Sequence, residues 1–210
     1  MLKSYKKVIA LGAHPDDIEM GCGGFISKLI ENGVAVCTHV MSKCDDQFEE
    51  MEKGKLVSEY ENSMSSLGVK DKNLYDFPNK ELPQNTIEMM NLLNTLQNEI
   101  KPDLVLIPFL DDPHQDHSAV AHAAIRTFRG TETILQYEIL RHGSYSFTPT
   151  LFVDITDYLD QKVESLKHYE SQYSKRKYFD SETFRSLART RGAQSGYNYA
   201  EGFLVYKMFW

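Results

Sequence analysis

Short apolar runs alternate with helix-like segments along most of the chain, and no other feature restricts the fold as much. Residues 8–11 (VIAL), 34–41 (VAVCTHVM) and 104–107 (LVLI) are compact runs rich in aliphatic and β-branched side chains, which is typical of buried strands. Residues 25–30 and 86–100 lie between them and repeat apolar side chains at helical spacing. Because such units build parallel sheets covered by helices, we expect an α/β fold, a Rossmann-like three-layer sandwich with a mainly parallel sheet.

The remaining elements continue this pattern with one change near residue 149. We expect helices over residues 47–67, 118–128 and 181–191, a helix that begins at Thr156 or Asp157, and strands over residues 134–139, 151–155 and 203–206. The last strand either closes the sheet or packs at its edge as a loop. Because no linker, repeat or low-complexity tract divides the sequence, we interpret residues 1–210 as a single domain.

Composition excludes several classes of protein. The formal net charge is −7 and no large cluster of Lys and Arg is present, which argues against a nucleic-acid partner. No apolar run approaches the roughly 18 residues that a membrane span requires, and the first residues lack a signal-peptide core. We therefore expect no membrane insertion and a cytoplasmic location. Cys22, Cys37 and Cys44 are an odd number without metal-site spacing, so reduced thiols are expected.

Two polar clusters directly follow apolar runs. Residues 12–19 (GAHPDDIE) follow the first predicted strand, and residues 108–117 (PFLDDPHQDH) follow the third. The carboxyl ends of parallel strands meet at one edge of a sheet, where ligands bind. Imidazole and carboxylate groups suit zinc, which in catalytic sites keeps one position open for water. Each cluster alone is also typical of a turn or helix cap, but their coincidence favours a metal site.

The motifs in these clusters resemble those of a known family. AHPDD at residues 13–17 and HQDH at residues 114–117 are similar to the AHPDD and HxDH motifs of the LmbE-like, or PIG-L-like, N-acetylglucosaminide deacetylases. Residues 152–156 (FVDIT) and the tail over residues 191–203 also resemble bacterial members, so the likeness covers nearly the whole chain.

The resemblance implies a role for each motif residue. It implies that His14, Asp17 and His117 ligate Zn²⁺, with Fe²⁺ as the alternative ion. It also implies that Asp16 is the general base, that His114 is an oxyanion stabiliser or general acid, and that Asp116 orients His114 or a neighbouring ligand. These last three residues, Asp16, His114 and Asp116, form the expected catalytic group.

The expected reaction follows from the same resemblance. It is hydrolysis of the N-acetyl group of a small-molecule sugar, a GlcNAc-type conjugate or sugar nucleotide, with release of acetate and a free amino sugar. The alternatives are deacetylation of a thiol-precursor glycoside and a non-hydrolytic metal- or nucleotide-binding module on the same fold. A homo-oligomer is left open, as is whether Lys55, His142, Arg189 or Arg191 contacts substrate.

Overall fold

The strands of the protein form one mixed sheet. In this computed structural model, residues 5–45, 53–140, 145–173 and 175–209 are described. Within them, seven strands follow the order β3-β2-β1-β4-β5-β7-β6. Their bounds are β1 (Lys7–Gly12), β2 (Ala35–Val40), β3 (Asp71–Leu74), β4 (Leu104–Pro108), β5 (Thr133–Tyr137), β6 (Leu151–Asp154) and β7 (Ala200–Lys207). Strands β1 to β5 pair in parallel, whereas β7 pairs antiparallel with both β5 and β6.

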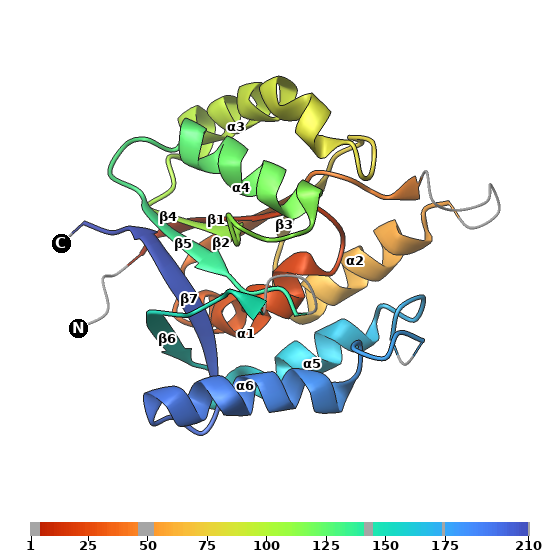
Figure 1. The fold of residues 1–210 in the computed structure, drawn as a ribbon, viewed down its shortest axis with the longest axis vertical. Coiled ribbons are helices and arrows are strands. Elements are labelled where there is room, and N and C mark those ends of the chain that lie inside the picture. Colours follow the sequence, from red (N-terminus) through yellow and green to blue (C-terminus); the bar gives the residue numbers. More distant parts are fainter. Residues whose placement is uncertain (1–4, 46–52, 141–144, 174, 210) are drawn as a thin grey trace.

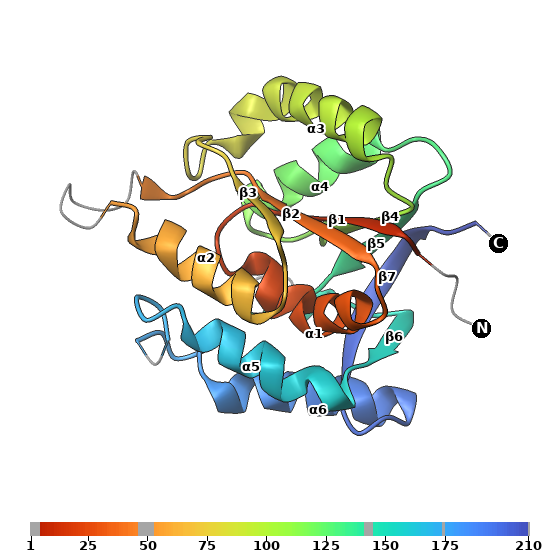
Figure 2. The same ribbon diagram turned by 180° about the vertical axis from the view of Figure 1, so that it is seen from behind.

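Helices cover both faces of this sheet (Figures 1 and 2). The helices α3 (Thr86–Ile100) and α4 (Gln115–Thr127) lie on one face, and α1 (Asp17–Glu31) and α2 (Lys55–Ser66) lie on the other. The helix α5 (Leu159–Lys167) packs outside α1 and α2, and α6 (Ser181–Ser195) packs against α5 and the strands β6 and β7. Short 3₁₀ turns precede α3 and α5, at Leu82–Asn85 (η3) and Thr156–Tyr158 (η5). The predicted α/β sandwich with a mainly parallel sheet is confirmed.

Two cores lie on opposite faces of the sheet because side chains alternate along each strand. Val8 and Ala10 of β1 join the core beneath α1, α2 and α5. Ile9 and Leu11 join the core beneath α3 and α4. The three cysteines are buried and form no disulfide, as expected. No helix among the described residues is long and apolar enough to cross a membrane.

Several predicted elements differ from the observed ones, and one observed strand was not predicted. Strand β3 was missed because its sequence, DKNL, is mostly polar, which an edge strand tolerates. Strand β7 is longer than residues 203–206 and lies between β5 and β6, so β6 forms the edge. The helix predicted over residues 47–67 begins at Lys55, after Gly54 adopts a left-handed conformation, and residues 47–52 lie outside the described part.

Helix α1 begins eight residues earlier than the predicted residues 25–30 and lies very close to the sheet. A Cβ atom at Gly21 would lie 2.0 Å from the ring of Tyr137 on β5, so only glycine permits this approach. The helix is broken at Cys22, where φ is −145°. The short first part of α1 therefore sits above the end of β1 and carries Asp17 in its first turn.

Candidate active site

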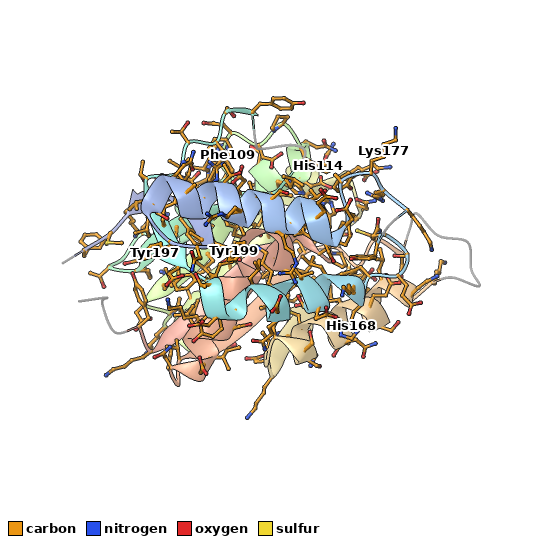
Figure 3. All side chains as sticks on the ribbon, turned by 90° about the horizontal axis from the view of Figure 1, so that it is seen from below. Phe109, His114, His168, Lys177, Tyr197 and Tyr199 are labelled. Carbon is orange, nitrogen blue, oxygen red and sulfur yellow. The ribbon has the colours of Figure 1, made fainter. Side chains whose placement is uncertain are left out.

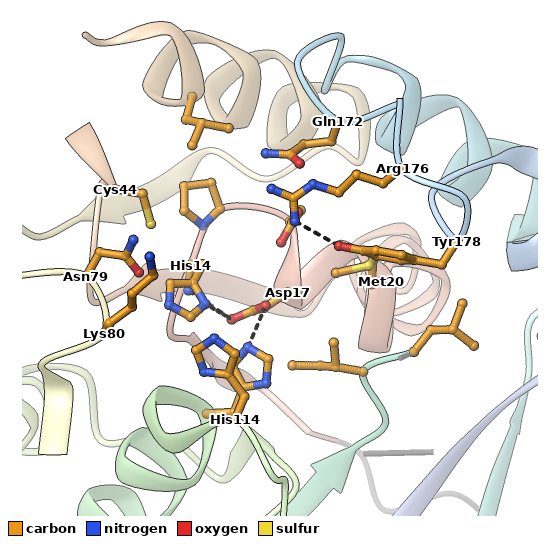
Figure 4. Close-up of a pocket in the computed structure, with 16 residues that line it drawn as sticks. His14, Asp17, Met20, Cys44, Asn79, Lys80, His114, Gln172, Arg176 and Tyr178 are labelled. Atoms are coloured by element: carbon orange, nitrogen blue, oxygen red, sulfur yellow. Dashed lines mark hydrogen bonds and ion pairs between the residues drawn. The ribbon is translucent and has the colours of Figure 1, made fainter. Parts of the chain in front are cut away.

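The two predicted polar clusters meet at the switch point of the sheet. Strand β1 pairs in parallel with β4, while β2 and β3 extend from the other side of β1. Loops at such a reversal diverge and leave a crevice at the carboxyl ends of the strands. A cavity of about 270 Å³ lies there, and His14, Asp16, Asp17, His114 and His117 line it (Figure 4).

Asp17 is fixed by the backbone of the loop that precedes it. Its Oδ2 accepts the N–H groups of Ala13 at 2.9 Å and His14 at 2.8 Å. Its Oδ1 lies 3.2 Å from Nε2 of His117. Burial alone would raise the pKa of Asp17, but His117 and His14 hold it well below its usual value. Asp17 is therefore a carboxylate aimed at an imidazole from the other loop.

Each of the two imidazoles nearest Asp17 has its second nitrogen held by a carboxylate. His14 Nε2 lies 2.9 Å from Asp116 Oδ2, and His117 Nδ1 lies 3.1 Å from Asp112 Oδ2. Burial would lower the pKa of His117, but Asp17 and Asp112 raise it to about 10. Metal-binding histidines are commonly oriented by a carboxylate in this way.

The spacing of the remaining donor atoms suits one divalent cation. Asp17 Oδ2 lies 3.6 Å from His14 Nδ1, and Asp17 Oδ1 lies 3.2 Å from His117 Nε2. Two ligands at about 2.0–2.1 Å from a tetrahedral zinc ion lie roughly 3.3 Å apart. Donor atoms of His14, His114 and His117 lie within 4.8 Å of one another, so a third imidazole is also within reach. The residues present fit a metal of the zinc type.

Asp16 occupies a strained backbone position beside these residues. Its φ of 98° is left-handed, a conformation that costs a residue other than glycine about 1–3 kcal/mol. Burial, and then the charges of Asp17 and Glu19, raise the pKa of Asp16 well above its usual value. This turn lets the neighbouring carboxylates part, so that Asp17 meets His117 while Asp16 lines the cavity. A carboxylate so placed can exchange a proton with a group in the cavity.

His114 caps helix α4 with its ring. Nδ1 accepts the N–H of Asp116 at 3.2 Å, so the proton of the neutral ring lies on Nε2. Burial and the nearby His117 and His14 lower the pKa of His114 to about 4. Asp116 itself is fully buried, and the contact of its carboxylate with His14 is compatible with the expected orienting role.

Several residues around the cavity were not singled out from the sequence. Asp112 lies two residues before His114 in the same loop, and this position within the second polar cluster could have indicated a role in the site. Lys80 lines the cavity from the segment before η3, and Arg176 and Tyr178 line it from the segment between α5 and α6. Tyr178 belongs to an aromatic-rich stretch of the sequence, but no local pattern indicated Lys80 or Arg176, because they approach the site only through the tertiary fold.

The residues whose contact with substrate the sequence did not decide either do not line the cavity or lie outside the described residues. Lys55 begins α2 but does not line the cavity. Arg191 is buried and forms a bidentate ion pair with Glu138, with nitrogen–oxygen distances of 2.7 to 3.0 Å. Arg189 donates to the carbonyl of Asn198. His142 lies outside the described residues.

The fold and the site define an α/β protein with a His/Asp centre at the switch point of its sheet. The PIG-L family, described as GlcNAc-PI de-N-acetylase, matches residues 9–128, and the chain belongs to this family. The diacetylchitobiose deacetylase of Thermococcus kodakarensis is 31% identical to this chain over an alignment 222 residues long. The alignment covers 94% of this chain and 82% of that protein.

Solved structures show the same fold. The N,N'-diacetylchitobiose deacetylase of Pyrococcus horikoshii, solved with its inhibitor MPG, superimposes with a TM-score of 0.80 at 27% identity, over 96% of this chain and 84% of that one. A conserved protein of Thermus thermophilus superimposes with a TM-score of 0.81 at 22% identity, over 97% and 96% of the two chains.

Proposed function

We propose that this protein is a zinc-dependent N-deacetylase that hydrolyses the acetamido group of an N-acetylated sugar. The observation that carries the proposal is the pairing of Asp17 with His117 at 3.2 Å, beside His14 and at the wall of the cavity that holds Asp16. Relatives from Thermococcus kodakarensis and Pyrococcus horikoshii carry the name diacetylchitobiose deacetylase, which supports an acetamido sugar as the substrate.

His14, Asp17 and His117 would hold the ion. When bound, the ion lowers the pKa of water toward about 7 and polarises a carbonyl group. Asp116 keeps His14 oriented through the 2.9 Å contact, and Asp112 does the same for His117 at 3.1 Å. These contacts leave Nδ1 of His14 and Nε2 of His117 toward Asp17.

Asp16 and His114 would move protons and stabilise charge. Asp16 takes one proton from the attacking water, and the water oxygen forms a bond to the acetamide carbon. His114 Nε2–H donates a hydrogen bond to the carbonyl oxygen as negative charge develops there. The C–N bond then breaks, and Asp16 returns its proton to the leaving nitrogen. The products are acetate and a free amino sugar.

Acetate release tests the function. Purified protein with analysed metal content is incubated with N,N'-diacetylchitobiose and other N-acetylglucosamine conjugates, and acetate and free amine are measured. Asp16→Asn should retain the metal and lose activity by about 10²–10⁴-fold, the usual range for a general base. The matched control is Asp111→Asn, because Asp111 is an exposed carboxylate in the β4 loop that does not line the cavity.

One outcome would reject deacetylation, and another would reject only the role of Asp16. One is the absence of acetate from every N-acetylated sugar, which would favour the non-hydrolytic binding module. The other is full activity of Asp16→Asn at full metal content, which would remove Asp16 from the mechanism. Elemental analysis decides between Zn²⁺ and Fe²⁺.

A further inference from the structure

Two cationic side chains line the cavity from segments far apart in the sequence. Lys80 and Arg176 approach the histidine cluster from different sides, as Figure 4 shows. Several other cations of the protein have carboxylate partners, for example Lys162 with Glu201 and Arg185 with Asp160. Among the ion pairs of the described residues, neither Lys80 nor Arg176 takes part.

The backbone at Lys80 is held in a conformation that lysine does not favour. Its φ is 66°, in the left-handed region where glycine or asparagine is preferred. Asp116 maintains it, because its Oδ2 accepts the Lys80 N–H at 2.7 Å and its Oδ1 accepts the Leu82 N–H at 3.3 Å. The same carboxylate orients His14. Lys80 is therefore positioned by the residue that positions a proposed metal ligand.

Arg176 is also set by local structure. Its Nη1 donates to the hydroxyl of Tyr178 at 2.9 Å, and its carbonyl accepts the N–H of Phe179. Phe179 is completely buried, with its ring packed edge-on against Tyr169. The segment between α5 and α6 is thus anchored by an aromatic core, which presents the guanidinium at the cavity.

We propose that Lys80 and Arg176 bind an anionic group, a phosphate or a carboxylate, carried by the acetamido sugar. Arginine and lysine are the usual partners of phosphate and carboxylate oxygens, and arginine can offer two parallel donors. Among the described residues, Lys80 and Arg176 are the lysine and arginine side chains that line this cavity, and its carboxylates Asp16 and Asp17 lie where β1 leads into α1. The inference rests on the proposed function and narrows its substrate class to charged N-acetylated sugars.

The test compares substrates of similar size that differ in charge. Methyl N-acetylglucosaminide is neutral, N-acetylglucosamine 1-phosphate carries a phosphate, and the carboxymethyl glycoside carries a carboxylate. We expect kcat/KM to be about tenfold higher for at least one charged sugar, as for a hydrogen bond to a charged group. That preference should shrink as salt rises, because both cations are exposed and are screened. The two charged sugars separate phosphate from carboxylate recognition.

Variants then assign the preference to the two residues. Lys80→Gln and Arg176→Gln should each reduce the charged-to-neutral ratio of kcat/KM several-fold, and Lys80→Arg should restore most of it. The ratio is the informative quantity, because the charge of Arg176 also lowers the pKa of Asp16 and so affects both substrates alike. Lys177→Gln is the matched control, since Lys177 is exposed in the same segment, does not line the cavity and projects outward (Figure 3).

The experiments distinguish loss of anion recognition from loss of deacetylation. Equal turnover of all three sugars, or variants that leave the ratio unchanged, would overturn anion recognition while deacetylation stands. If no sugar releases acetate, calorimetric binding of N-acetylglucosamine 1-phosphate still decides: weaker binding to both variants than to Lys177→Gln supports the anion site, and equal binding overturns it.

Discussion

The ammonium nitrogen of Lys162 lies 2.6 Å from a carboxylate oxygen of Glu201, and both side chains are buried. Glu201 also accepts the backbone N–H groups of residues 24 and 25, at 2.9 and 2.7 Å. Lys162 donates to the carbonyl of Met20 at 2.7 Å. Because α1 is broken at Cys22, this pair satisfies backbone groups on both sides of the break. The pair thereby fixes the first turn of α1, which carries Asp17.

Removal of one partner should destabilise the protein strongly. Glu201→Ala leaves the Lys162 ammonium buried without its carboxylate, so the free energy of unfolding should fall by about 3–5 kcal/mol. Urea denaturation followed by circular dichroism measures this change. The double variant Lys162→Met, Glu201→Leu should lose less, because no charge is left unpaired. A loss below about 1 kcal/mol, as for an exposed ion pair, would contradict the assignment.

The close packing of α1 on β5 can be tested with two glycines of the same helix. Gly21→Ala places a methyl group 2.0 Å from the ring of Tyr137, so thermal unfolding should show a loss of about 1–3 kcal/mol. Gly23→Ala is the control, because its nearest neighbour would be 3.5 Å away, at Lys162. Equal stabilities of the two variants would contradict the observed contact.

The carboxylate behind His117 should strengthen metal binding. Asp112→Asn removes the charged partner of His117 Nδ1, and zinc affinity should fall about 10–100-fold. Competition with a chromophoric chelator measures the affinity. Asp111→Asn, which alters an exposed carboxylate one residue earlier, should bind zinc as the parent does. Unchanged affinity of Asp112→Asn would show that His117 needs no such orientation.

Metal removal should lower thermal stability through the proposed ligands. A ligand at 100 times its Kd stabilises the native state by about 2.7 kcal/mol, so added zinc should raise Tm and a chelator should reverse the rise. His117→Ala should abolish this difference. His168→Ala should keep it, because His168 is an exposed residue that follows α5 and does not line the cavity (Figure 3). A zinc-dependent Tm in His117→Ala would exclude His117 as an essential ligand.

Local sequence patterns were sufficient to predict the class of fold and to locate the two motifs, at residues 13–17 and 114–117. Strand β1 and strand β4 are recognisable as buried apolar runs, because a parallel sheet covered on both faces needs them. The side chains of residues 13–17 share one short loop, and those of residues 114–117 share one helical turn. Which side chains lie together within each cluster therefore follows from their spacing in the sequence.

Contacts between distant residues were decided only by the tertiary structure. His14 meets Asp116 across 102 residues, and Glu201 reaches the backbone of Gly24 across 177. Nothing in the local sequence around Lys80 or Arg176 indicates the cavity that they line. Secondary structure follows from side chains a few positions apart, whereas these partners meet only after β1 pairs with β4 and α5 packs over α1. The sequence by itself thus determined the chemistry of each loop, and the packed sheet determined which loops share a site.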